Sequence, residues 1–509
     1  MNFKNNKFLL IILIILPVIA FSETQTVESW LSKQTLIRTY DDGAPGFGNQ
    51  SATINAINRI RQLGFNGTFE YIYLTKPNKI AVLFNLPKNL PEDYLDQRRN
   101  IRFITYKKYY DLMIAHNLPL TTLAFVGGGG DLVWNLEMEG IDVGSDWNEE
   151  EYPYNNDAYM LNTKVAVRIS PWLSGNCAPN STIYLPDQKT PLNDCESTKK
   201  FVVTPVATFT QAKDYLQFDL DGKRLLQEKP ALKTLMDVME NQSKNIWPLY
   251  GQTLHQNWND PDPDKPYARV MLGVIAAARY AEVHDSELQK PLIIPVFYDI
   301  TREAKELFDL INDKNWDQYQ FPGKEKARAA LHDLNVADYF EIANLTDPDA
   351  ANKILNLKNG HILLLSVGSL PKVVFDAIYN YDATNVWPQI REGENTFNTL
   401  LLTGRPHIRV SMPSETNWEP TDVGFGPNVF DKSKQLDEKF NHFIFPGEKF
   451  WADLQPEVTL GNYIIDAQDH SSLLSQYFAW LKKEALKKEN DRIYYLLEQG
   501  MKQSGREVR

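Results

Sequence analysis

Short apolar runs alternate with stretches of helical periodicity through the first half of the chain. Residues 52–65 place Ile54, Ile57, Ile60 and Leu63 at three-residue steps, which predicts a helix with one buried face. Gly64 stands where such a helix would end. Strands are predicted over residues 35–40, 69–74, 79–84 and 164–173, with a further strand at 200–209, and residues 101–131 predict a strand, a helix, a strand and a glycine loop.

The same alternation resumes after a polar stretch in the middle of the chain. The predicted elements are helices in 224–241, 268–284 and 301–313, a buried strand in 290–300, strand–loop–helix in 361–381, helix–turn–strand in 393–413, and a long amphipathic tail in 472–503. Asp260–Pro266 (DPDPDKP) is typical of a linker, which places a domain boundary near it. We therefore predict two α/β lobes, residues 23–264 and 265–509, facing a central cleft.

The first residues have the pattern of a secretory signal. Lys4 and Lys7 precede the apolar run FLLIILIILPVIAF, and Ala20 and Ser22 are small residues at its end. The run is short for a transmembrane helix, which needs about 20 residues. We predict a signal peptide over 1–22 and an exported mature chain, secreted or periplasmic, and an uncleaved anchor stays open as the alternative.

Composition restricts the class of protein. The 509 residues are 43% hydrophobic and 23% charged, which is globular, and the length favours two or three domains. The formal net charge of -12 argues against a broad nucleic-acid partner, which would need a basic surface. The only cysteines, Cys177 and Cys195, lie in a segment rich in turn residues, and export predicts that they form a disulfide.

A glycine-rich loop, DDGAPGFGNQ, joins the first predicted strand to the first predicted helix. Gly46 and Gly48 would let a ligand approach the backbone, and Asn49 stands at the helix start, where free N–H groups favour an anion. Asp41 and Asp42 stand at the strand end, a position suited to a general base. An ordinary turn with an Asn cap accounts for the same residues. The loop matches neither the P-loop nor the full G-x-G-x-x-G pattern.

Three more loops follow predicted strands. FVGGGGD gives either a binding loop or a flexible turn. Ser366, Gly368 and Ser369 lie at a strand exit, ahead of Pro371 in the first turn of a helix.

The last loop is acidic. Glu392, Glu394, Asn395 and Thr396 precede a helix, where they would bind ribose hydroxyls and phosphate or simply cap the helix.

The segment REGENTFNTLLLTGRPHI resembles the R-G-E-D-S segment and following Gly-x-Pro of bacterial protein-arginine rhamnosyltransferases. It is also similar to the E-G-x-x-T segments of other nucleotide-sugar transferases. With the N-terminal glycine loop, the order of motifs resembles a GT-B glycosyltransferase of two Rossmann-like lobes. This resemblance extends in layout over most of the mature chain and at residue level over 363–410.

The resemblance implies an enzyme that moves a sugar from a nucleotide-sugar donor to an unknown acceptor. Glu392, Glu394, Asn395 and Thr396, together with the glycines and serines of the other loops, would bind the donor. Asp41 or Asp42 would be the base of an inverting displacement, with no metal and no cofactor. His255 and Trp258 would contact the sugar or acceptor, although structural roles are the commoner fate of such residues.

Export conflicts with this function, since nucleotide sugars are cytoplasmic. The alternative is an exported two-lobed binding protein for a saccharide or small anion, without catalysis. A third interpretation is a hydrolase that uses Gly127–Gly130 and Asp131. The sequence predicts no stable membrane insertion after signal cleavage and no particular oligomeric state.

Overall fold

The computed structural model describes most of both predicted lobes. The described residues are 25–41, 48–73, 77–127, 161–169, 181–185, 188–192, 225–250, 266–297, 300–319, 321–391, 394–409, 450–453 and 455–505.

Within these ranges the first lobe is built on a sheet of eight strands in the order β3-β4-β2-β1-β5-β6-β7-β8. The five central strands, β4 to β6 in that order, run parallel, and β3, β7 and β8 run antiparallel to their neighbours. The strands are β1 (Leu36–Asp41), β2 (Thr68–Tyr73), β3 (Asp93–Asp96), β4 (Ile101–Thr105), β5 (Thr121–Gly127), β6 (Thr163–Ile169), β7 (Ser181–Leu185) and β8 (Gln188–Leu192).

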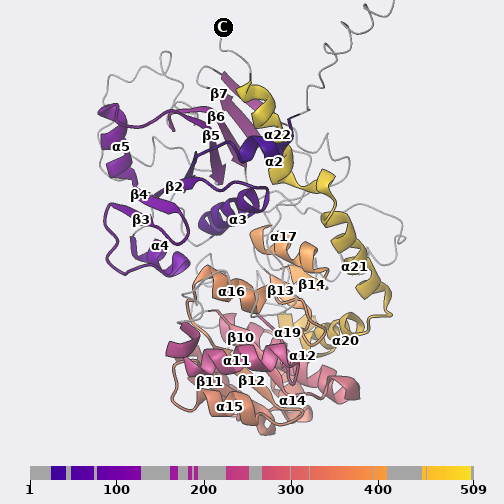
Figure 1. Ribbon diagram of the computed structural model, residues 1–509. Coiled ribbons are helices and arrows are strands. Elements are labelled where there is room, and N and C mark those ends of the chain that lie inside the picture. The colour runs from indigo at the N-terminus through magenta and orange to yellow at the C-terminus, as the bar shows by residue number, and fades with distance from the viewer. Residues whose placement is uncertain are drawn as a thin grey trace, which may run out of the picture.

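Helices cover both faces of this sheet (Figure 1). One face packs on α2 (Val27–Leu31), α3 (Gly48–Gln62), α4 (Pro77–Phe84) and α22 (Arg492–Ser504), and the other on α5 (Tyr106–Ile114). The predicted stripe on α3 is buried, with Ile60 fully inside, and Gly64 ends the turn after the helix at a φ of 104°.

The second lobe is built on a parallel sheet in the order β11-β12-β10-β9, and a single bridge from Leu249 to Ile390 connects it to the pair β13-β14. The strands are β9 (Asn245–Ile246), β10 (Leu292–Val296), β11 (Phe340–Asn344), β12 (Ile362–Ser366), β13 (Gln389–Arg391) and β14 (His407–Arg409). All five residues of β10 and of β12 are buried, as expected for parallel strands covered on both faces.

Two layers of helices enclose the second sheet. They are α11 (Pro230–Glu240), α15 (Ala350–Asn356) and α16 (Lys372–Tyr379) on one face, and α12 (Pro266–His284), α13 (Thr301–Ile311), α14 (Lys324–Asp333), α19 (Phe450–Asp453) and α20 (Pro456–Gln468) on the other. Short 3-10 turns lie at Ser286–Leu288, Trp316–Gln318, Val336–Asp338 and Lys488–Asn490, and α17 (Glu394–Thr403) precedes β14.

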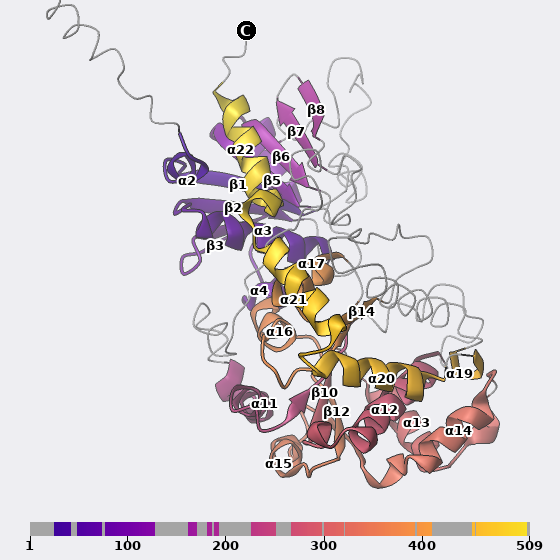
Figure 2. The same ribbon diagram turned by 90° about the vertical axis from the view of Figure 1, so that its right-hand side faces the viewer.

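The end of the chain ties the lobes together. Helix α20 packs on α12, α21 (Leu473–Ala485) packs on α17, and α22 returns to the first sheet against β6 (Figure 2). Ile493, Leu496 and Leu497 are fully buried in the first lobe's core. Asp491 is the N-cap of α22, and its carboxylate forms an ion pair with Arg59 of α3, with 2.7 Å between the nitrogen and the oxygen. This pair holds the start of α22 against α3.

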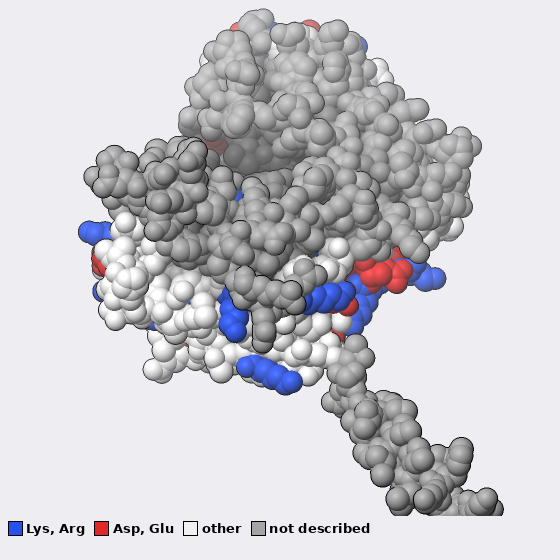
Figure 3. Space-filling model, turned by 90° about the horizontal axis from the view of Figure 1, so that it is seen from above, with Lys and Arg blue, Asp and Glu red and all other residues white. Residues whose placement is uncertain are grey.

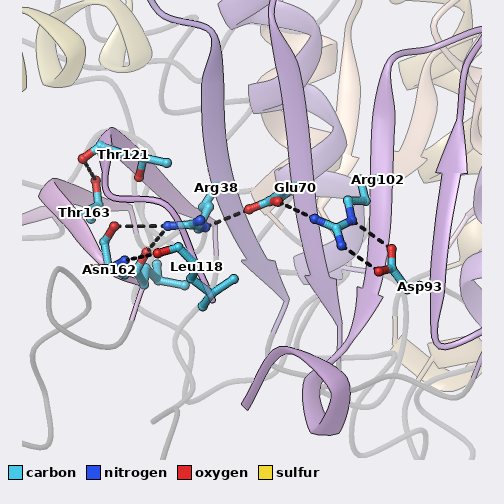
Figure 4. Close-up of polar contacts among 9 residues, drawn as sticks. Arg38, Glu70, Asp93, Arg102, Leu118, Thr121, Asn162 and Thr163 are labelled. Atoms are coloured by element: carbon cyan, nitrogen blue, oxygen red, sulfur yellow. Dashed lines mark hydrogen bonds and ion pairs between the residues drawn. The ribbon is translucent and has the colours of Figure 1, made fainter. Parts of the chain in front are cut away.

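A row of alternating charges crosses the first sheet (Figure 4). Arg38 on β1 donates to Glu70 on β2 at 2.7 Å, Glu70 accepts from Arg102 on β4 at 2.9 Å, and Arg102 donates to Asp93 on β3 at 2.6 Å. Arg38 is fully buried and also donates to the carbonyl oxygens of Leu161 and Asn162. The row therefore neutralises the positive charge of the buried Arg38 guanidinium and links four adjacent strands.

The structure confirms the predicted α/β class with two Rossmann-like lobes and C-terminal helices. One predicted strand, residues 79–84, is wrong. They lie in α4, where Ile80, Ala81, Leu83 and Phe84 are buried while Val82 is 39% exposed. A short apolar run does not distinguish a strand from a buried helix by periodicity, and Pro77 favours the helical start.

The lobe boundary also differs from the expected position near residue 264. Helix α11 packs on α15, and β9 pairs with β10, so the second lobe already includes Pro230–Ile246. In the other direction, α22 belongs to the core of the first lobe. The linker-like stretch 260–266 therefore falls within the second lobe's part of the sequence, and residues 251–265 lie outside the described residues. No helix in the described part of the chain is both long and apolar enough to cross a bilayer.

Replacing Leu497 by Ala is expected to lower the free energy of unfolding by about 2–5 kcal/mol, because it opens a cavity in the first lobe's core. Urea unfolding followed by circular dichroism measures this. Leu473→Ala, at a side chain that is 59% exposed on α21, is the control and should change stability little. Equal effects of the two changes would contradict the packing of α22 described above.

Replacing Glu70 by Ala is expected to cost about 3–5 kcal/mol, since Arg38 would keep a buried charge without its carboxylate. Asp93 is the opposite end of the row of charges, and its side chain is 33% exposed, so Asp93→Ala should lower the free energy of unfolding by less than about 1 kcal/mol. Thermal unfolding of both variants separates the two cases. A similar shift for both would mean that the buried pair is not compensating Arg38.

Candidate functional site

The carboxyl edge of the first sheet contains its topological switch point. From β1 the chain builds β2 and β4 on one side, and later β5 and β6 on the other. Ligands of open α/β sheets bind at the strand ends where the order reverses. Asp41 ends β1 and Gly127 ends β5, and the two strands are in register at Tyr40 and Val126. Both glycine-rich loops predicted from the sequence therefore start at this switch point.

The carboxyl edge of the second sheet gathers the other predicted loops. The chain leaves β12 after Ser366 and enters α16, and it leaves β13 after Arg391 and enters α17. Leu249 bridges both Val296 at the end of β10 and Ile390 of β13. The exits of β10, β12 and β13 are thus neighbours in space.

The two carboxyl edges face each other across the lobe boundary. Helix α3, which follows β1, contacts α17, and α4, which follows β2, contacts α16 (Figure 1). Because each of these helices begins at the carboxyl end of a parallel strand, their N-terminal ends all lie along the boundary between the lobes.

The structure describes only part of the first loop. Asp41 is the last residue of β1, in register with Tyr73, and Gly48 and Asn49 begin α3 as predicted. Asp42, Gly46 and the side chains of Asp41 and Asn49 lie outside the described residues. The position of Asp41 at a strand end is therefore established, and its role as a base stays a prediction.

The three residues predicted at the end of β12 differ in their burial. Ser366 is buried, and its Oγ accepts from the N–H of Ile300 at 3.4 Å, at the N-cap of α13. Gly368 has a φ of +67°, with open space where a β-carbon would lie, and Ser369 is exposed. Ser366 thus links two strand exits, whereas Gly368 and Ser369 stand at the open surface of the loop.

Most of the acidic segment lies inside the start of α17, whereas the sequence predicted that it would precede the helix. Glu394, Asn395 and Thr396 form the first turn of the helix, and Thr396 is buried. Glu392 and the side chains of Glu394 and Asn395 lie outside the described residues. Their contact with a donor stays a prediction.

The sequence analysis missed a buried ion pair at the start of α16. The ammonium of Lys372 lies 2.7 Å from each carboxylate oxygen of Asp376, and Lys372 is only 7% exposed. Burial raises the pKa of Asp376, while Lys372 and the Asn380 side chain oppose that rise. The signal was present as Pro-Lys at a helix start, a place where the helix dipole disfavours a cation.

Aromatic rings from three strand exits converge beside this pair. Phe375 of α16 stacks on Tyr379 at 5.2 Å and lies 4.5 Å from Phe297 after β10 and 5.2 Å from Tyr250 after β9. Tyr250, Phe297 and Phe375 are half-buried. By contrast Trp247 is fully buried and donates its Nε1–H to the carbonyl of Pro388, so it is a core residue.

Tyr73 is a buried tyrosine at the end of β2. Its hydroxyl has no hydrogen-bond partner among the described residues, and burial, with a contribution from Glu92, raises the pKa of Tyr73 to about 12. The group therefore stays a neutral phenol at physiological pH.

Several predicted residues cannot be placed. His255, Trp258, Cys177, Cys195 and Asp131 lie outside the described residues. Within the described ranges no group of three or more His, Cys, Asp and Glu has the spacing to hold a metal ion. The disulfide and the metal-free site stay predictions.

Figure 3 shows the molecule from above, where the visible described surface is mostly uncharged, with separate Lys and Arg side chains and an adjacent group of Asp and Glu. This view covers one face only. The expectation of no nucleic-acid partner stays a prediction.

No protein-family model and no curated protein matches the chain. Among solved structures, it is similar to an alpha-glucosyltransferase in complex with UDP-glucose and DNA containing an abasic site, with 10% identity, 88% of this chain and 98% of that chain covered, and a TM-score of 0.29. It is also similar to a glycosyltransferase from Rickettsia africae ESF-5, with 11% identity, 90% and 100% covered, and a TM-score of 0.28. An alpha,alpha-trehalose-phosphate synthase (UDP-forming) from Burkholderia vietnamiensis gives 10% identity, 89% and 98% covered, and a TM-score of 0.27. Likeness at this level assigns no activity to this chain.

Replacing Gly368 by Ala should lower the free energy of unfolding by only about 1–2 kcal/mol, because the space beside it is open. This is the penalty for placing an alanine in the left-handed backbone conformation. Gly323→Ala is the matched control, also at positive φ, but its methyl group would collide with the backbone nitrogen of Ala452. Thermal unfolding should show a clearly larger loss for Gly323→Ala. Equal losses would mean that the β12 exit is not open.

Proposed function

We propose that this chain is an exported glycosyltransferase that moves a sugar from a nucleotide-sugar donor to an acceptor. The observation that carries the proposal is the meeting of two carboxyl edges of parallel sheets, through α3 with α17 and α4 with α16. This arrangement supports a site in which the start of α17, at Glu394–Thr396, lies across the lobe boundary from the strand end that carries Asp41. The resemblance of that segment to nucleotide-sugar transferases supports the same conclusion.

In the proposed reaction the donor lies on the second lobe. The first turns of α16 and α17 offer N–H groups to the diphosphate, and Lys372 adds a positive charge at the start of α16. Glu394 accepts from ribose hydroxyls. The half-buried rings of Tyr250, Phe297 and Phe375 offer an apolar surface for a planar or sugar ring.

The acceptor lies toward the first lobe. Asp41 or Asp42 takes the acceptor's proton while the acceptor atom bonds to the anomeric carbon. The bond from that carbon to the diphosphate breaks, and its electron pair leaves with the diphosphate. A single displacement of this kind inverts the anomeric configuration and needs no metal ion.

Export determines where the reaction can take place. An exported transferase meets nucleotide sugars only if it enters another cell, or else it uses a lipid-linked donor. The signal-like residues 1–22 support export, and the same residues define the mature chain that the experiments below use.

The first test is a thermal-shift screen of residues 23–509 with UDP, GDP, ADP, dTDP and their sugars. A ligand at 100 times its dissociation constant adds about 2.7 kcal/mol of stability, which gives a clear shift. Glu394→Ala should abolish the shift. A shift with free saccharides and with none of the nucleotides would instead favour the binding protein without catalysis.

The second test concerns the base. With the nucleotide sugar found by the screen, replacing both Asp41 and Asp42 by Asn should lower turnover by about 100-fold or more while nucleotide binding stays. Turnover is followed by release of the nucleoside diphosphate. Intact turnover in the double variant would exclude both carboxylates as the base.

A further inference from the structure

Lys372 occupies an electrostatically unfavourable position. It is the first residue of α16, where the helix dipole is positive, and its side chain is only 8% exposed. A buried ammonium at this end of a helix is disfavoured by both the dipole and the loss of water. The fold keeps it there nonetheless, four residues after the open position at Gly368.

Asp376 compensates this charge in the structure as it stands. Both of its carboxylate oxygens lie 2.7 Å from the Lys372 ammonium, and its side chain is 16% exposed. The order, Lys before Asp by four residues, opposes the helix dipole, so the pair adds little to helix stability. Among the described residues, Lys372 and Asn380 are the groups whose interactions favour the charged carboxylate.

We propose that the Lys372–Asp376 pair exchanges its counter-ion when the donor binds: Lys372 moves from Asp376 to the diphosphate, and Asp376 takes up a proton from solvent. This inference rests on the proposed function and adds its regulation by pH. No covalent bond changes between heavy atoms in the exchange. The ammonium stays protonated, the diphosphate replaces the carboxylate as its partner, and the carboxylate becomes a neutral acid.

Burial explains why the proton follows. A carboxylate in this environment is ionised only with help from Lys372, because desolvation raises its pKa. When the ammonium leaves, the remaining contact with Asn380 does not balance the burial. Donor binding is therefore coupled to proton uptake, and by linkage the affinity falls as pH rises.

The test is titration calorimetry of residues 23–509 in two buffers of different ionisation enthalpy at the same pH. The ligand is whichever of UDP, GDP, ADP and dTDP gives the largest thermal shift. Wild type should take up as much as about one proton more per nucleotide than Asp376→Asn does, because the nucleotide's own titration contributes equally to both proteins. Where the excess is one proton, wild-type affinity should fall about tenfold per pH unit relative to that variant.

Asp309→Asn is the matched control, since Lys305 and Asp309 form a pair of the same order and spacing on α13, with Lys305 83% exposed. It should keep the wild-type proton uptake. Lys372→Gln is the second variant, in which Asp376 is already without its cation and the excess uptake should also vanish.

Nucleotide binding with equal proton uptake in wild type and both Asp376→Asn and Lys372→Gln would overturn the exchange and leave the proposed function standing. Binding of none of the four nucleotides would overturn both.

Discussion

The parallel direction of the strands is the constraint on which the rest of the structure depends. In a parallel sheet every connection returns over a face, so each helix that follows a strand starts at one and the same edge. Two such sheets, turned edge to edge, bring the starts of α3, α4, α16 and α17 to one boundary. Residues as distant as Asp41 and Thr396 are thereby brought to the same part of the molecule without any direct pairing between the two sheets.

The buried cations of this protein are held by different kinds of partner. Arg38 is locked by Glu70 and by two carbonyl oxygens, and Lys244 by the carbonyl oxygens of Leu355 and Leu357. Lys372 is held by a carboxylate on its own helix. A backbone carbonyl cannot change its charge, so Arg38 and Lys244 each keep polar partners at any pH, whereas Lys372 is held by a carboxylate, which can take up a proton.

The sequence predicted those parts of the fold that periodicity records. The stripe on α3 was predicted because a three-residue period reflects one buried face, and β12 was predicted because a continuous apolar run reflects a strand covered on both faces. Residues 79–84 were misassigned because a run of five apolar residues, 80–84, fits either period. The membership of β9 and α11 in the second lobe depends on pairing with distant residues, which local pattern does not contain. Lys372 was missed because its burial and its contact with Asp376 arise only from packing.

The return of α22 to the first lobe has a consequence for biogenesis. Ile493, Leu496 and Leu497 complete a core whose other members begin at Val27, so the first lobe lacks part of its interior until nearly the whole chain has been synthesised. The first lobe therefore cannot complete its folding before α22 has been synthesised. For the exported protein that we propose, this delay leaves the chain incompletely packed until its end has been made, and incomplete packing is compatible with passage through a translocation channel.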